Sequence, residues 1–136
     1  LIERGEQVTE RTPADAAHVL ADISAMNRFT LYEYFITDKV GHAQDMEQAK
    51  VILPQLARFI RELLGRLDLD RMTVILTSDH GNIEDLSVRN HTLHQVPTII
   101  WGARRHEMAS RIQSLADITP AIVAVLTNTI EGHERN

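Results

Sequence analysis

The chain has 136 residues, of which 43% are hydrophobic and 24% charged, and its formal net charge is −5 with neutral His. This length suits one domain or part of a larger one. The acidic balance argues against nucleic acid or an acidic membrane surface as a partner. The absence of cysteine excludes disulfides and thiolate ligands, and fits the cytoplasmic location that we expect. No apolar run approaches the ~18 residues that cross a bilayer, and Leu1-Ile2-Glu3-Arg4-Gly5-Glu6 does not resemble a signal peptide.

The first third of the chain predicts a helix followed by a strand. Thr12 can cap a helix in which Pro13 takes the first position and Asp15 completes a capping box, so we expect a helix from there to about Arg28. Residues 29–36 (FTLYEYFI) are rich in aromatic and branched side chains, which is typical of a buried strand. Residues 37–45 are polar and predict a connection.

The rest of the chain continues this alternation of helices and strands. A long amphipathic helix is expected next, with Pro54 either kinking it or lying in its first turns. Its apolar residues on or near one face are Val51, Leu53, Leu56, Ile60, Leu63 and Leu64. The segments 72–76 and 96–101 predict two strands on either side of the polar stretch 77–95. Thr119-Pro120 begins a last helix over residues 121–126, and the tail from Thr127 is expected to fray.

Alternating strands and helices predict an α/β fold with a mostly parallel sheet flanked by helices, in a single domain over residues 1–136. Three strands and three helices are few for such a fold, so we expect the chain to be the C-terminal portion of a larger sheet. The sheet edge left by missing strands would then be covered by a partner or open to self-association.

Polar residues with metal-binding chemistry lie at three ends of the predicted strands. Asp38 and His42 follow the first strand and can converge on one ion if the chain makes a single helical turn there. Asp79 and His80 follow the second strand, where Gly81 allows the strand to break. His91 precedes the third strand. Ligands gather at such strand ends in open α/β sheets, so three such elements together favour a metal site over surface decoration.

The chemistry of these side chains indicates which ions they suit. Two imidazoles and one carboxylate are a recognisable set for a divalent transition metal. Imidazole suits Zn²⁺ or Mn²⁺, and the carboxylate biases the set toward harder ions.

Three segments resemble the metal-binding signature of the alkaline phosphatase superfamily, with cofactor-independent phosphoglycerate mutases as the nearest branch. They are Asp38-x-x-Gly41-His42, Thr77-Ser78-Asp79-His80-Gly81-Asn82-x-Glu84-Asp85 and His91-Thr92-x-x-x-Val96-Pro97. Asp117-Ile118-Thr119-Pro120-Ala121-Ile122 also resembles the start of that superfamily's last helix. The resemblance covers residues 29–126, and its most specific part is the DHGN segment with its acidic pair.

The resemblance implies two divalent metal ions, Mn²⁺ or Zn²⁺, and a phosphorylated small molecule as substrate. It assigns Asp38, His42 and His91 to one ion, and Asp79 and His80 to the other. His91 is preferred to His94 because the family's ligand lies six residues before the proline of its VP pair, leaving His94 as a neighbour of the ligands. The family's Ser or Thr nucleophile and a further aspartate ligand come from its N-terminal part, and no residue here stands in their context.

The expected function is therefore a divalent-metal phosphoryl-transfer domain of the phosphomutase or phosphohydrolase kind, inactive as this isolated chain. A sulfatase or nucleotide phosphodiesterase of the same superfamily remains open, as does a non-catalytic module that associates through its sheet edge.

Several other polar residues have two interpretations. Glu84 and Asp85 either orient the histidines or are solvated loop carboxylates. Lys39 and Arg89 lie beside the proposed ligands, where surface charge is preferred to phosphate contact. The cluster Arg104-Arg105-His106 is interpreted as solvated.

Overall fold

The computed structural model describes residues 11–133, and the side chains of residues 11–127. The segment Leu1–Glu6, for which no signal peptide is expected, lies outside the described residues. The chain divides into two compact units. The first unit comprises Leu1–Glu33 and Glu47–Leu67, and the second comprises Tyr34–Met46 and Asp68–Asn136. The prediction of a single domain is not tested by this division.

The first unit contains helix α1 (Pro13–Met26) and nearly all of helix α3 (Met46–Leu64). α1 begins as predicted, because the Thr12 hydroxyl accepts from the Asp15 backbone N–H and the Asp15 carboxylate accepts from the Thr12 backbone N–H. Pro54 lies within α3. The buried side chains of these helices are Ala17, Ala21, Ala49, Ile52 and Phe59.

The strand predicted from the apolar residues 29–36 is wrong. Residues 29–34 have no regular secondary structure, and Ile36 already begins helix α2 (Ile36–Ala43), so no strand forms at 29–36. A strand needs a neighbour for its backbone groups, and the strands of the described chain pair with each other instead. Leu31 is consequently 80% exposed. The long helix predicted after this segment is confirmed as α3, although its buried face includes Ile52 and leaves two of the six expected residues, Val51 and Leu53, exposed.

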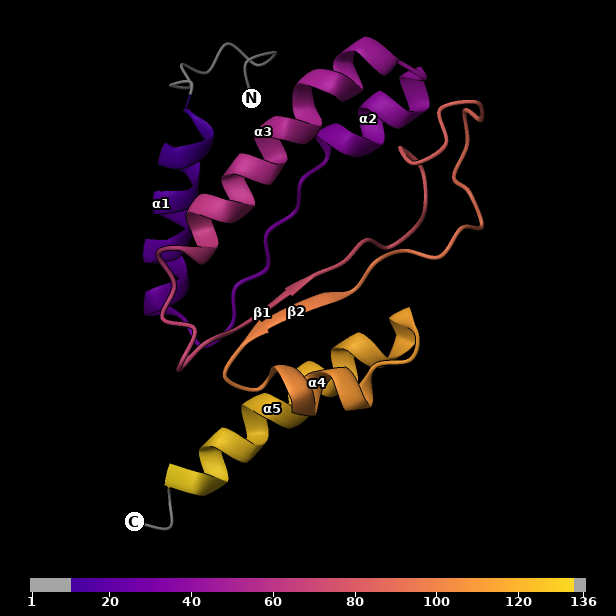
Figure 1. Ribbon diagram of the computed structural model, residues 1–136. Helices are drawn as coiled ribbons and strands as arrows, with labels where there is room; N and C mark the ends of the chain where they lie inside the picture. The colour runs from indigo at the N-terminus through magenta and orange to yellow at the C-terminus, as the bar shows by residue number, and fades with distance from the viewer. Residues whose placement is uncertain (1–10, 134–136) are drawn as a thin grey trace, which may run out of the picture. The chain divides into compact units, whose positions relative to one another are not determined.

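The second unit is built on strands β1 (Thr73–Leu76) and β2 (Ile99–Gly102), which pair antiparallel (Figure 1). Thr73 lies opposite Gly102, and Leu76 lies opposite Ile99. The prediction of a mostly parallel sheet is therefore not borne out by the described chain. Parallel neighbours need a crossover, commonly a helix, whereas residues 77–98 contain none and return the chain directly.

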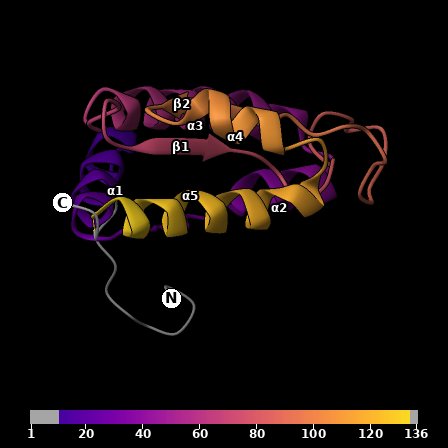
Figure 2. The same cartoon turned by 90° about the horizontal axis from the view of Figure 1, so that it is seen from below.

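The second unit also contains α2 and the helices α4 (Arg105–Arg111) and α5 (Ile118–His133), and Figure 2 shows all three from below. α4 contacts β2 and α5, and its Met108 is almost fully buried. Sequence reasoning missed α4 and interpreted Arg104 as solvated, but its guanidinium pairs with Glu107 at 2.6 Å. Two predicted strands, over 72–76 and 96–101, are confirmed in shortened form.

The last helix begins where the sequence indicates. Ser114 and Asp117 form a capping box in the short 3-10 helix η2 (Leu115–Asp117), directly before α5. The Gln113 backbone N–H, with help from the Ser114 hydroxyl, lowers the pKa of the Asp117 carboxyl. α5 continues to His133, beyond the predicted end at residue 126. No helix in the described part of the chain has both the length and the hydropathy needed to span a bilayer.

Gly102 gives a test of how β2 ends. Its φ of +100° is unfavourable for other residues, and an added methyl group would overlap the Met72 carbonyl oxygen. We expect Gly102→Ala to lower the free energy of unfolding by about 1–3 kcal/mol in chemical denaturation. Gly65→Ala is the matched control, because its methyl would lie 3.5 Å from the nearest described atom, the Arg61 carbonyl oxygen. Equal stability of the two variants would contradict this account.

Candidate metal centre

Helix α2 supplies the first two side chains of the candidate site. Asp38 and His42 are one helical turn apart, so both project from the same side of α2. The sequence predicted a polar connection here, with convergence of these two residues conditional on a helical turn, and the structure forms that turn. α2 ends at Gln44, whose backbone is left-handed with φ 54°. The Gln44 side-chain amide donates to the Leu86 carbonyl oxygen at 3.1 Å, which fastens the end of α2 to the loop 77–98.

The loop 77–98 brings the other side chains to α2. Its two arms lie side by side beyond β1 and β2 (Figure 1), held by an antiparallel bridge between Gly81 and Thr92. The Thr92 N–H donates to the Gly81 carbonyl oxygen at 2.9 Å. This bridge keeps the two arms close together, and His80 and His91 lie directly before its two members. The rings of His80 and His91 stack across the two arms, with centroids 3.5 Å apart and planes 14° apart.

Three atoms from Asp38, His42 and His91 form a nearly equilateral triangle. Oδ1 of Asp38 lies 3.4 Å from Nε2 of His42 and 3.5 Å from Nε2 of His91, and the two nitrogens are 3.2 Å apart. Tetrahedral Zn²⁺ with ligand bonds of about 2.05 Å separates its donors by about 3.3 Å. The donor types and their spacing therefore fit a divalent cation.

The orientation of the His42 ring prepares it to donate an electron pair. Nδ1 of His42 lies 2.7 Å from the carbonyl oxygen of Arg89. A carbonyl oxygen can only accept, so Nδ1 carries the proton in the neutral ring and Nε2 has a free lone pair. A histidine that binds a metal through one ring nitrogen usually donates a hydrogen bond from the other, which fixes the orientation of the ring. Arg89 thus contributes its backbone, while its side chain is exposed.

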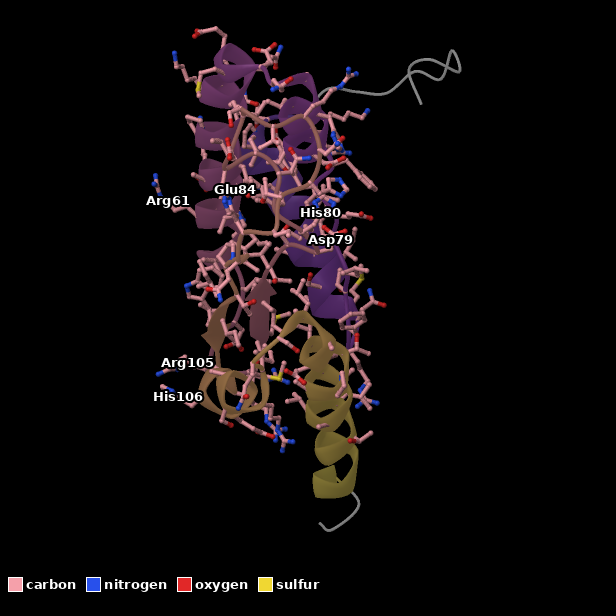
Figure 3. All side chains as sticks on the ribbon, turned by 90° about the vertical axis from the view of Figure 1, so that its right-hand side faces the viewer. Arg61, Asp79, His80, Glu84, Arg105 and His106 are labelled. Carbon is pink, nitrogen blue, oxygen red and sulfur yellow. The ribbon has the colours of Figure 1, made fainter. Side chains whose placement is uncertain are left out.

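Asp79 and His80 lie beside the triangle without joining it. Nε2 of His80 is 3.9 Å from Oδ1 of Asp38 and 3.5 Å from Oδ1 of Asp79. Asp79 is 84% exposed, and Figure 3 shows it next to His80. Nδ1 of His80 is buried and has no hydrogen-bond partner among the described residues. The structure therefore brings together three of the five predicted ligands and places the other two in the adjacent position.

Glu84 braces the two arms of the loop. Its carboxylate accepts from the Asn82 backbone N–H at 2.6 Å and from the Thr92 hydroxyl, and it contacts Nδ1 of His94 at 3.2 Å. The Thr92 hydroxyl is the main reason that the pKa of Glu84 is lowered to about 2. His94 thus contacts this brace, and it is not part of the triangle.

Asp85 and Lys39 have simpler surroundings. The Asp85 carboxylate accepts from the Ser87 hydroxyl at 2.6 Å and from its backbone N–H at 3.0 Å, within a local turn. The Ser87 hydroxyl lowers the pKa of Asp85. The Lys39 side chain is exposed. The sequence did not decide the roles of these two acidic residues. In the structure the Glu84 carboxylate connects the two arms of the loop, whereas the Asp85 carboxylate accepts hydrogen bonds within a local turn.

Sequence reasoning missed the contribution of Asn82. Its side chain is buried at 7% exposure, and its Nδ2 donates to Oδ1 of Asp38 at 3.0 Å. The only sequence signal was its place directly after Gly81 in the DHGN segment. Most asparagines in proteins are exposed, so nothing in the sequence indicated that this one is buried. In the structure its burial draws attention to its hydrogen-bond partner, because a buried amide needs one.

Comparison with known proteins identifies the family. A family model described as the metalloenzyme superfamily matches residues 7–129. The chain belongs to the metalloenzyme superfamily. This match, together with the mutase relatives described next, confirms the resemblance to alkaline phosphatase-like enzymes and cofactor-independent phosphoglycerate mutases. Membership implies binding of a divalent metal, and the donor set of the triangle fits that requirement.

Curated relatives of this metalloenzyme chain include two kinds of mutase. A 2,3-bisphosphoglycerate-independent phosphoglycerate mutase of Moorella thermoacetica is 24% identical over 128 residues, which cover 86% of this chain and 25% of the relative. A phosphopentomutase of Alkaliphilus metalliredigens is 33% identical over 91 residues, covering 65% and 23%. A phosphoglycerate mutase of Gloeothece citriformis is 28% identical over 135 residues, covering 89% and 24%. The chain spans about a quarter of the length of these relatives. No solved structure matches it significantly.

The Glu84 brace predicts a pH dependence of stability. Because folding lowers its pKa from 4.5 to about 2, the carboxylate contributes stability above pH 4.5, and this contribution is lost as the pH falls toward 2. Its side chain is 42% exposed. With screening by solvent we therefore expect Glu84→Gln to cost about 1 kcal/mol at pH 7. The difference from the wild type, measured by urea denaturation, should shrink by more than half at pH 3. A difference that is constant with pH would contradict the assignment.

Proposed function

We propose that this chain carries the metal-binding part of a phosphoryl-transfer enzyme of the phosphomutase or phosphohydrolase kind. The observation that carries the proposal is the triangle of Asp38 Oδ1, His42 Nε2 and His91 Nε2, with sides of 3.2–3.5 Å. In this proposal these three residues hold one divalent ion, Mn²⁺ or Zn²⁺. Their side chains are 40–48% exposed, so a small ion reaches them from solvent.

The proposal gives each residue a defined task. His42 and His91 each present one nitrogen, and Asp38 adds the negative charge that offsets part of the charge of the ion. A bound divalent cation supplies positive charge that stabilises the oxygens of a transferring phosphoryl group. Asp79 and His80 are proposed as ligands of a second ion, as the resemblance implies, and their position beside Asp38 is consistent with this role.

The remaining groups needed for catalysis are proposed to come from outside these 136 residues. In the alkaline phosphatase superfamily a Ser or Thr nucleophile and another aspartate lie in the N-terminal part of the enzyme. The chain spans only about a quarter of its relatives, which agrees with a division of the active site. The relatives named above are mutases of phosphorylated small molecules by their names, which favours a phosphorylated small molecule as substrate over a sulfate ester.

Metal binding by the chain tests the proposal directly. We expect calorimetric titration to show one tightly bound Mn²⁺ or Zn²⁺, with at least tenfold weaker binding in Asp38→Ala, His42→Ala and His91→Ala, because each loses one donor. Wild-type affinity in all three variants would refute the site.

Two histidine variants serve as matched controls for that titration. His94→Ala removes an imidazole three residues from His91 that contacts Glu84 instead of the triangle. His106→Ala removes an exposed imidazole on α4, which lies apart from His80 in Figure 3. Both should bind the ion within about threefold of the wild type. Tenfold weakening in His94→Ala would instead make His94 a ligand.

The isolated chain is expected to have no measurable turnover of an aryl phosphate in the presence of Mn²⁺ or Zn²⁺, because the proposed nucleophile lies elsewhere. Light scattering on the same sample measures its mass. Turnover that is abolished in His91→Ala would show that the chain is catalytically sufficient. A stable oligomer that binds no metal would favour the non-catalytic module.

A further inference from the structure

Asn82 is the one buried polar side chain among the residues whose side chains the structure describes. A buried amide without a partner would lose hydrogen bonds that water supplies in the unfolded chain, so its place must be explained by what it contacts. Nδ2 of Asn82 donates to Oδ1 of Asp38 at 3.0 Å. An ionised carboxylate only accepts, and this fixes which end of the amide faces Asp38.

The acceptor of this bond is the same oxygen that faces the histidines. Oδ1 of Asp38 lies 3.4 Å from Nε2 of His42 and 3.5 Å from Nε2 of His91. A carboxylate on a helix can rotate about its side-chain bonds and turn either oxygen outward. The bond from Asn82 resists this rotation and uses one lone pair of Oδ1, leaving another for a cation.

Gly41 provides the space in which Asn82 lies. It is buried on α2 between Asp38 and His42. A methyl group added there would overlap Oδ1 of the Asn82 side chain and would also press on its Cγ. The amide therefore packs directly against the backbone of α2, which a larger residue at position 41 would prevent.

The backbone of Asn82 is also held in place. Its N–H donates to the Glu84 carboxylate at 2.6 Å, and its carbonyl oxygen accepts from the Asp85 N–H at 3.2 Å. The side chain thus projects from a fixed support toward Asp38. Since Glu84 also accepts from Thr92, the residue after His91, the support connects both arms of the loop.

We propose that Asn82, seated on Gly41, is a positioning residue that holds Oδ1 of Asp38 toward the cation; this rests on the proposed metal site. Neither residue is assigned as a ligand. Their effect is to keep the donor triangle assembled, and Gly41 acts only by admitting the amide.

A double-mutant cycle of Mn²⁺ affinity tests the proposal. Asn82→Ala should weaken calorimetric Mn²⁺ binding about tenfold, as loss of a partner behind a ligand commonly does. Gly41→Ala should weaken binding to a similar extent, because the methyl displaces the amide. In the Asn82→Ala background the atoms that the methyl would strike are gone, so adding Gly41→Ala should change the affinity less than threefold.

Matched controls separate positioning from general damage to the fold. Gly65→Ala adds the same methyl group at a site where its nearest described contact is ordinary, and Asn27→Ala removes an exposed amide bonded to the Ile23 carbonyl oxygen. Both should bind Mn²⁺ like the wild type. Wild-type affinity in Asn82→Ala, or the same loss from Gly41→Ala in both backgrounds, would overturn the proposal.

A measurement without metal distinguishes failure of this proposal from failure of the metal site. In the NMR spectrum of the metal-free chain, the Asn82 side-chain amide should be shifted and slow to exchange with solvent. Asp38→Ala should abolish both properties, whereas His106→Ala, at an exposed position on α4, should leave them unchanged. If the wild type binds no ion yet shows this behaviour, the metal site fails and the Asn82–Asp38 contact stands. If Asp38→Ala leaves the amide unchanged, the positioning role fails whatever the affinity of the chain for Mn²⁺.

Discussion

The candidate site depends on one carboxylate oxygen and the groups that surround it. Oδ1 of Asp38 faces the Nε2 atoms of two histidines and accepts from the Asn82 amide. Lone pairs on an oxygen and two imidazole nitrogens at 3.2–3.5 Å repel one another unless a proton or a cation lies among them. The arrangement is therefore suited to a positive charge at its centre. Each surrounding contact, from the Arg89 carbonyl to Asn82, acts to keep these atoms facing that position.

The loop 77–98 makes this convergence possible even though it has little regular structure. An antiparallel bridge joins its arms at Gly81 and Thr92, the rings of His80 and His91 stack, and the Glu84 carboxylate accepts hydrogen bonds from both arms. Ordering a loop of this length costs conformational entropy. Most of its side chains are polar, so the burial of apolar surface offsets little of that cost. Hydrogen bonds to one ionised carboxylate are stronger than neutral ones, and they replace part of the missing apolar core.

All five proposed ligands belong to the second unit of the chain. Asp38 and His42 lie in Tyr34–Met46, while the others lie in Asp68–Asn136, and most of α3 separates these segments in sequence. The first unit contributes none of them. Within the metalloenzyme superfamily, a chain of about a quarter of its relatives' length can therefore contain a complete candidate site for one ion. The sheet of the described chain has two strands, and a strand such as the one expected at residues 29–36 would form only beside a further neighbour.

The sequence by itself determined the features that depend on neighbouring residues. The capping box of Thr12 and Asp15, the start of α5 at Asp117-Ile118, and the chemical nature of the Asp and His donors are all local properties. The resemblance in the Asp38, DHGN and His91 segments was sufficient to indicate the family. These features can be read from one sequence because each depends on residues only a few positions apart.

Tertiary structure alone decided the rest. The antiparallel pairing of β1 and β2, the absence of a strand at residues 29–36 and the presence of α4 depend on which segments meet, which composition does not specify. The partnership of Asn82 with Asp38 and Gly41 joins residues about 40 positions apart. A buried hydrogen bond is stable only if donor, acceptor and space are supplied together, and only the folded chain brings all three to one place.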